Sequence, residues 1–205
     1  MTGKRLRHPL PADGEIVSDL ILQSDCGMLP ALFGADVRSL LCRLQGARAN
    51  PFSAESILVA EAESRGTEAS VVGMLVGSLA EADRSAQLHT AILLFRWYGL
   101  EIVSRLPRLA KAGKALESLE PDDYYVSNIA VLPEWRGRGL GKEILLAAAE
   151  EARAAGARRI VLDVEGHNEA ARAFYARLGF HRESEFRIEL GRGIGFSFVR
   201  LALGL

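Results

Sequence analysis

One short segment, Arg136-Gly137-Arg138-Gly139-Leu140-Gly141-Lys142, limits what this chain can fold into more than any other. It lies between residues 124–132, an apolar run typical of a β-strand, and residues 140–155, where apolar side chains recur at helical spacing. A helix N-terminus carries unpaired backbone N–H groups and a partial positive charge, and glycine lets an anion approach them closely. The segment therefore predicts a pyrophosphate site within an α/β fold, with a plain strand-to-helix turn as the alternative.

The glycine spacing argues against the two common nucleotide-binding loops. A Walker A loop requires Ser or Thr after Gly-Lys, but Glu143 follows Gly141-Lys142, and Arg136 occupies the position of the first glycine. A Rossmann loop requires GxGxxG, whereas the glycines at 137, 139 and 141 form GxGxG. Residues 191–195 have a similar composition but precede a strand-like run, so we interpret them as a hairpin turn without a ligand.

The order of the other elements predicts the fold class. Helical spacing covers residues 13–45, with breaks near residues 27–30 and at Gly34. A further helix is predicted over residues 168–178, with Asn168 as its N-cap. Strands are predicted at residues 4–10, 56–61, 71–79, 159–164, 180–190 and 196–203, with a polar loop at 63–68. Strands come first and then alternate with helices, which predicts an α/β domain with a mixed sheet.

Residues 82–121 differ in character from the rest of the chain. Their apolar side chains recur at helical spacings, which predicts one or two amphipathic helices, broken at Pro107 and closed by Glu120-Pro121. The positions concerned are Leu88, Ile92, Leu93, Phe95, Leu100, Leu106, Leu109 and Leu116. Three roles fit this segment: a layer that completes the core, a wall of a substrate pocket, or the surface of a homodimer.

The composition narrows the classes of function. The 205 residues fit one domain with a substantial core. Lys plus Arg number 25 against 26 for Asp plus Glu, so no broad nucleic-acid-binding surface is expected. The longest apolar stretch, residues 88–103, contains charges and is too short to span a membrane. Residues 1–15 lack the apolar core of a signal peptide, and Cys26 and Cys42 form neither a disulfide nor a metal-ligand pattern, which favours a cytoplasmic protein without a bound metal.

Two motifs, in this order and at this separation, resemble those of the GNAT superfamily of acetyl-CoA-dependent N-acetyltransferases. Arg136-Gly137-Arg138-Gly139-Leu140-Gly141 resembles that family's R/Q-x-x-G-x-G/A loop, and residues 168–180 resemble its N-x-x-A-x-x-x-Y-x-x-x-G-F signature. The resemblance implies a single N-acetyltransferase domain over residues 1–205, with an acetyl-CoA-binding core at residues 122–190. It also implies a mixed, mostly antiparallel central sheet flanked by helices, with residues 82–121 as a helical insertion before the fourth strand.

The resemblance further implies a reaction and the residues that carry it. The reaction is direct attack on the acetyl thioester by a primary amine of a small molecule or a protein. Tyr175 is expected to protonate the departing thiolate, a buried aromatic on a helix face being the alternative. The backbone of residues 129–131 is expected to bind the pantetheine arm like an added strand. The residues implied in binding acetyl-CoA are Ile129, Ala130, Val131, Arg136, Gly137, Arg138, Gly139, Leu140, Gly141, Lys142 and Asn168.

The general base is the one role in this site for which several residues compete. Deprotonating a lysine-like amine at pH 7 costs about 4–5 kcal/mol, so a base matters for such an acceptor. Where many relatives carry an acidic residue, this chain has Ser127-Asn128. Our candidate is Asp163, on the strand after the pyrophosphate helix, and Glu165 lies on the same face of that strand. Asp122, Asp123 and a chain of water molecules are the alternatives.

Two other functions stay open at this point. A catalytically silent sensor or scaffold that binds acyl-CoA would share the same fold and loop. A nucleotide-binding regulatory module would also use a glycine-rich loop, although the Walker A mismatch weakens that interpretation. The identity of the amine acceptor, the acyl-chain preference and the oligomeric state do not follow from the sequence.

Overall fold

A computed structural model describes residues 4–63, 69–113, 118–191 and 193–205, without the side chains of residues 83–85. The predictions that concern residues 1–3, the loop at 64–68, Leu116 and Arg192 lie outside these residues.

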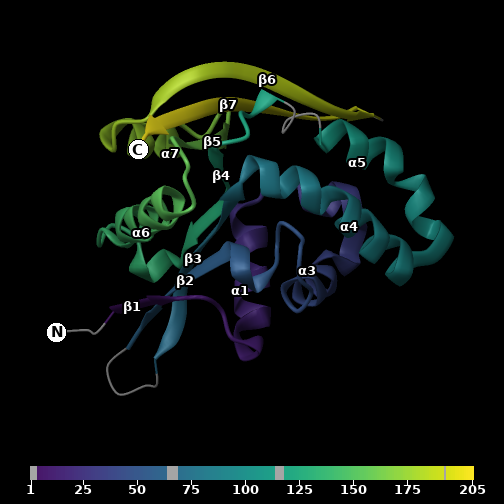
Figure 1. Ribbon diagram of the computed structural model, residues 1–205, viewed down its shortest axis with the longest axis horizontal. Coiled ribbons are helices and arrows are strands. Elements are labelled where there is room, and N and C mark those ends of the chain that lie inside the picture. The colour runs from purple at the N-terminus through teal and green to yellow at the C-terminus, as the bar shows by residue number, and fades with distance from the viewer. Residues whose placement is uncertain (1–3, 64–68, 114–117, 192) are drawn as a thin grey trace.

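The fold is built on one seven-stranded sheet with the strand order β1-β2-β3-β4-β5-β7-β6 (Figure 1). The strands are β1 (Lys4–Arg7), β2 (Ile57–Ala62), β3 (Ser70–Leu79), β4 (Asp123–Val131), β5 (Arg159–Glu165), β6 (His181–Gly191) and β7 (Ile194–Gly204). Neighbouring strands pair antiparallel except β4 and β5, which run parallel. The expected mixed, mostly antiparallel sheet is therefore confirmed.

Helices cover both faces of this sheet (Figure 1). They are α1 (Gly14–Ser24), α2 (Met28–Phe33), α3 (Val37–Gln45), α4 (Ala80–Tyr98), α5 (Leu106–Gly113), α6 (Leu140–Ala154) and α7 (Glu169–Arg177). Strand β2 shows why the sheet needs two layers of helix: Ile57 and Val59 belong to the core with α1–α4, whereas Leu58 and Ala60 belong to the core with α6 and α7. Successive side chains of a strand point to opposite faces, so both faces are apolar and both must be covered.

None of the described helices is by itself long and apolar enough to cross a membrane. The bent pair formed by Pro11–Ser24 and Met28–Gln45, at 104° to each other, meets that length and composition only when taken together.

Two predicted boundaries were wrong, and each has a backbone cause. The first strand ends at Arg7 rather than at residue 10, because a 3-10 helix (η1, Pro11–Asp13) begins soon after it. The break in the insertion lies at Gly99 rather than at Pro107. Gly99 has a φ of 56°, which ends α4, and a 3-10 helix (η4, Gly99–Ser104) follows. Pro107 is the second residue of α5, where proline's missing N–H costs nothing.

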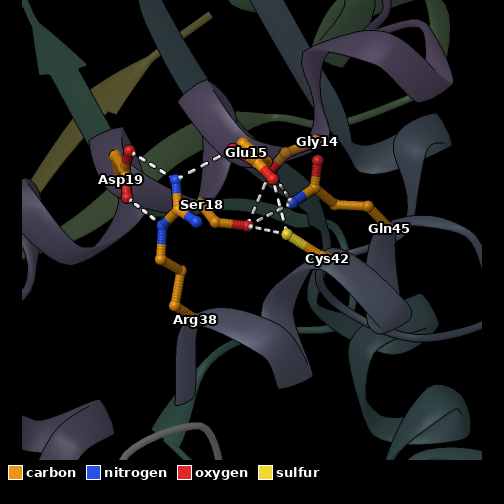
Figure 2. Close-up of polar contacts among 7 residues, drawn as sticks. All are labelled: Gly14, Glu15, Ser18, Asp19, Arg38, Cys42 and Gln45. Carbon is orange, nitrogen blue, oxygen red and sulfur yellow. Dashed lines mark hydrogen bonds and ion pairs between the residues drawn. The ribbon is translucent and has the colours of Figure 1, made fainter. Parts of the chain in front are cut away.

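A polar cluster joins the N-terminal half of α1 to α3 (Figure 2). In its buried part, the Gln45 amide donates to the Gly14 carbonyl at 3.1 Å and to the Ser18 hydroxyl at 2.8 Å. In its exposed part, the Arg38 guanidinium donates to Asp19 at 2.9 Å (Figure 2). This cluster orients α1, whose C-terminal residues reach the candidate site described below.

We predict that the buried part of this cluster carries its stabilising effect. Gln45→Leu removes the donor to Gly14 and Ser18 and is expected to lower the free energy of unfolding by about 1–3 kcal/mol. Arg38→Gln removes only a solvent-exposed ion pair and is expected to leave stability almost unchanged. Urea unfolding of the two variants beside the native protein measures the difference, and equal losses would contradict this account.

Candidate functional site

The sheet opens where its two parallel strands separate. Pairing between β4 and β5 runs from Asp123↔Arg159 to Val126↔Leu162, yet β4 continues to Val131 and β5 to Glu165. On the other edge of β4, Val76 pairs with Asn128 and Gly77 with Val126, so Ser127 is an extra residue in the ladder. Such a bulge bends its strand and increases the local twist. The bulge at Ser127 thus coincides with the point where β4 leaves β5.

A cavity of about 1540 Å³ occupies this opening. Pockets for a single small molecule usually measure about 300–1,000 Å³, so this cavity has room for two molecules that meet. One part of its wall comes from the loop before α6 and from α7. The other part comes from the turn between α1 and α2, from α4 and α5, and from β6 and β7.

The loop before α6 has the geometry of an anion site. Gly137 and Gly139 have φ angles of 72° and 82°, a left-handed conformation that favours glycine. The first backbone hydrogen bond into the helix is donated by Glu143 to the Gly139 carbonyl, at 3.1 Å. The N–H groups of residues 140–142 therefore precede the helical hydrogen-bond ladder. A Cβ atom added at Gly137 would meet no atom within 4 Å, so the space beside the loop is open.

Three exposed cations surround this loop, as the sequence predicted. The Arg138 guanidinium lies 5.1 Å from the centre of the Trp135 ring, and Lys142 extends from the first turn of α6. The Arg136 side chain turns back and donates from Nε to the Val131 carbonyl at 3.0 Å. Residues 129–131 line the cavity, but in this arrangement Arg136 already binds one backbone acceptor of that stretch.

Tyr175 lies on α7 in the wall of the same cavity, and its side chain is buried. Its ring packs edge-on against Phe174 and Phe180, with centroid separations of 5.1 and 5.4 Å. No hydrogen bond joins its hydroxyl to another described residue. Burial raises the pKa of the Tyr175 phenol above its ordinary value near 10, so the hydroxyl keeps its proton at neutral pH. Tyr175 is thus a proton-bearing donor at the cavity wall.

Asn168 confirms its predicted structural role. It is the N-cap of α7, and its side-chain oxygen accepts from the Ala171 N–H at 3.0 Å. Asn168 also lines the cavity.

The candidate base Asp163 lines the cavity but is held by a buried ion pair. The Arg200 guanidinium donates to both Asp163 carboxylate oxygens at 2.8 Å, and the Tyr125 hydroxyl donates to Oδ2 at 3.1 Å. Protonating Asp163 would weaken these charge-assisted bonds, which makes the catalytic role predicted for it harder to satisfy. Asp122 and Asp123 pair with Arg158 and Arg159 respectively. Neither Asp122 nor Asp123 is among the residues of the cavity wall.

The turn between α1 and α2 supplies site residues that sequence reasoning missed. Ser24, Asp25 and Cys26 line the cavity, and the Asn128 amide on β4 donates to the Ser24 hydroxyl at 2.9 Å. The pKa of the Asp25 carboxyl is raised by burial, and the nearby negative charge of Glu165 adds to this effect. The break near residue 27 was visible in the sequence, but no local signal places it beside β4.

Comparison with known proteins agrees with this geometry. The model of the acetyltransferase (GNAT) family matches residues 45–180, more than half of the chain. The chain belongs to the GNAT acetyltransferase family.

Individual relatives are similar to this GNAT chain either over a short segment or at low sequence identity. N-alpha-acetyltransferase 30 of Schizosaccharomyces pombe is 41% identical over 58 residues, which is 28% of this chain and 39% of that protein. The chain thus spans well under half of that relative. A solved acetyltransferase is 24% identical with a TM-score of 0.66, covering 98% of both chains. An acetyltransferase from Salmonella typhimurium, solved with its cofactor acetyl-CoA, is 16% identical with a TM-score of 0.56, covering 98% of this chain and 94% of that one. Because both identities are below 25%, these two structures show that the fold is shared and nothing more.

The helical insertion of this GNAT chain forms a wall of the cavity, one of the three roles that its sequence allowed. Thr90, Leu94 and Ile102 line the cavity together with Leu106 and Leu109. The opposite side of the insertion exposes apolar residues, among them Leu88, Ile92, Phe95 and Leu100. The homodimer surface stays a prediction.

We predict that Arg200 is needed chiefly for stability. Arg200→Met leaves the buried Asp163 carboxylate without its partner and is expected to lower the free energy of unfolding by about 3 kcal/mol. Arg158→Met, which removes a guanidinium that is 85% exposed, serves as the control. Urea unfolding measures both, and a loss of stability no larger than that of the control would contradict the prediction.

Proposed function

We propose that this GNAT enzyme transfers the acetyl group of acetyl-CoA to a primary amine by direct attack on the thioester. The observation that carries this proposal is a single cavity that contains an anion-binding helix N-terminus, an opening in the sheet and a buried phenol. Each of these features matches one part of the chemistry, and the bulge at Ser127 brings them together.

The cofactor part of the cavity suits the shape and charge of acetyl-CoA. The N-terminus of α6 and the cations Arg136, Arg138 and Lys142 would hold the pyrophosphate. The edge of β4 beyond Val126 has no strand partner on its β5 side among the described residues, so a pantetheine arm can bind it through amide hydrogen bonds. A solved structure of the same fold contains its cofactor acetyl-CoA, which supports acetyl-CoA as the ligand proposed here.

The reaction requires two proton transfers around one exchange of bonds. The amine nitrogen forms a bond to the carbonyl carbon of the thioester, and the bond from that carbon to sulfur then breaks. The nitrogen loses one proton, and the departing thiolate gains one. Tyr175 is proposed to donate a hydrogen bond, and then its proton, to the thiolate.

The proton of the amine needs a separate acceptor. Asp163 keeps this role only if its ion pair with Arg200 loosens on substrate binding, because both of its oxygens are engaged. A water molecule held in the cavity beside Asn128 or Glu165 is the simpler acceptor, and an amine of low pKa would need little help.

The cofactor site is tested by blocking the loop. Gly139→Val places a branched side chain at a φ of 82° beside the N-terminus of α6 and is expected to abolish acetyl-CoA binding measured by calorimetry. Gly156→Val imposes the same kind of backbone strain at a φ of 84°, beyond the other end of α6, and should leave binding unchanged. Binding of ATP or GTP in place of acetyl-CoA by the native protein would favour the nucleotide-binding alternative.

The role of Tyr175 is tested by removing its hydroxyl. Tyr175→Phe is expected to lower kcat by about 100-fold while the affinity for acetyl-CoA stays the same, because only the departing thiolate uses the proton. Tyr98→Phe, on α4 and outside the cavity wall, is the control. Full activity of the Tyr175→Phe variant would show that Tyr175 is not the group that protonates the thiolate. Tight acetyl-CoA binding without turnover of any amine by the native protein would favour the sensor alternative.

A further inference from the structure

Besides the pyrophosphate loop, two other kinds of wall line the cavity. One is apolar and comes from segments far apart in the sequence: Leu94 of α4, Ile102 of η4, Leu109 of α5, and Ile188 and Phe198 of the last two strands. The other is acidic and comprises Asp25, from the turn after α1, and Glu165, from the end of β5. A ligand that satisfied both walls would be apolar over most of its length and positively charged at one end.

The two carboxylates lie close enough to influence each other. Asp25 accepts hydrogen bonds from the backbone N–H groups of Gly27 and Leu29, at 2.8 and 3.1 Å, which fixes its position in the turn. Burial raises the pKa of the Asp25 carboxyl, the hydrogen bonds from Leu29 and Gly27 offset part of this rise, and repulsion by the charge of Glu165 adds to it. Among the described residues, the basic side chain placed against this pair is the imidazole of His167, 3.3 Å from Glu165 and 80% exposed. A positive charge between Asp25 and Glu165 would relieve this repulsion.

The acidic wall adjoins the point where the acetyl group would be transferred. Asp25 directly follows Ser24, and the Asn128 amide next to the bulge donates to the Ser24 hydroxyl at 2.9 Å. The Tyr175 side chain, 5% exposed, lines the same cavity, and its hydroxyl has no hydrogen-bond partner among the described residues. This hydroxyl is not among the fully buried atoms that lack a partner, so it is open to the cavity, where a ligand can supply a partner. An ammonium group held by Asp25 would therefore arrive beside the opening in the sheet.

We infer that the acceptor is a primary amine on an apolar aliphatic or aromatic body, bound as a cation by Asp25 and Glu165. The bound ammonium first loses one proton to water in the cavity, which frees the lone pair that attacks the thioester. The second proton leaves the nitrogen as the amide forms. This inference rests on the proposed acetyl transfer and names its substrate class. Asp25 and Glu165 select the charged end, and the wall of α4, α5, β6 and β7 selects the apolar body. Amines that carry a phosphate or carboxylate are excluded, because the carboxylates of Asp25 and Glu165 would repel that negative group.

The first test is a series of substrates for the native enzyme with acetyl-CoA. Across n-propyl-, n-butyl-, n-pentyl- and n-hexylamine, kcat/KM is expected to rise by about fourfold for each added methylene, as the apolar wall is covered. Glucosamine 6-phosphate should not be turned over. Equal kcat/KM values across the alkylamines, or preferred use of glucosamine 6-phosphate, would overturn the inference but leave acetyl transfer standing. A native enzyme that acetylates no amine at all would instead overturn the proposed function.

The second test removes each acidic charge in turn. Asp25→Asn and Glu165→Gln are each expected to raise KM for n-hexylamine by roughly 10-fold or more, as when a hydrogen bond to a charged group is lost. KM for acetyl-CoA should stay the same. Glu15→Gln, whose side chain is 80% exposed on α1, is the matched control. Among the described residues, no backbone N–H donates to the Glu165 carboxylate as Gly27 and Leu29 do to Asp25, so Glu165→Gln decides the result if Asp25→Asn fails to fold. An unchanged KM for n-hexylamine in Glu165→Gln would overturn the inference.

Discussion

The separation of β4 from β5 is the constraint on which the rest of this structure depends. A strand edge in the middle of a sheet leaves backbone N–H and C=O groups without a strand partner, and such groups must bind something else. Here the bulge at Ser127 turns β4 away after Val126, and the side chain of Arg136 binds the Val131 carbonyl. An exposed edge that ends at a helix N-terminus suits a ligand with amides along its length and phosphates at its end.

The opening also joins the two cores that the sheet would otherwise keep apart. One core packs α6 and α7 against one face, and the other packs α1 to α4 against the opposite face. Side chains from both layers reach the same cavity only because the sheet is interrupted between them. The ion pair between Asp163 and Arg200 ties β5 to β7 beside this opening, where β5 has lost its pairing with β4. The Tyr125 hydroxyl on β4 also donates to Asp163 at 3.1 Å, so Asp163 links β4, β5 and β7. We therefore interpret this cluster as a brace at the point where β4 and β5 separate.

What the sequence predicted well depends on contiguous residues. The loop of residues 136–142 and the N-cap at Asn168 are local features, so their geometry follows from neighbours along the chain. The partners of Asp163 could not be predicted in this way, because Arg200 and Tyr125 lie 37 and 38 positions away and meet it only through strand register. Asp25 was missed for the same reason, since only the packing of α1 against β4 brings it to the cavity. The break at Gly99 was missed because the conformation of a glycine depends on its context.

The burial of Tyr175 links the fold to the chemistry. A phenol whose pKa is raised by burial is a weaker acid than one in water, so complete proton transfer to a thiolate in the unliganded site is unfavourable. The same burial keeps the hydroxyl protonated and excludes water that would compete for the thiolate. Negative charge that develops on sulfur next to Tyr175 would favour the transfer, because the donor and acceptor would then share one poorly solvated space. Tyr175 is thus suited to act late in the reaction, when the bond to sulfur is breaking, and its packing against Phe174 and Phe180 holds the ring in place for that step.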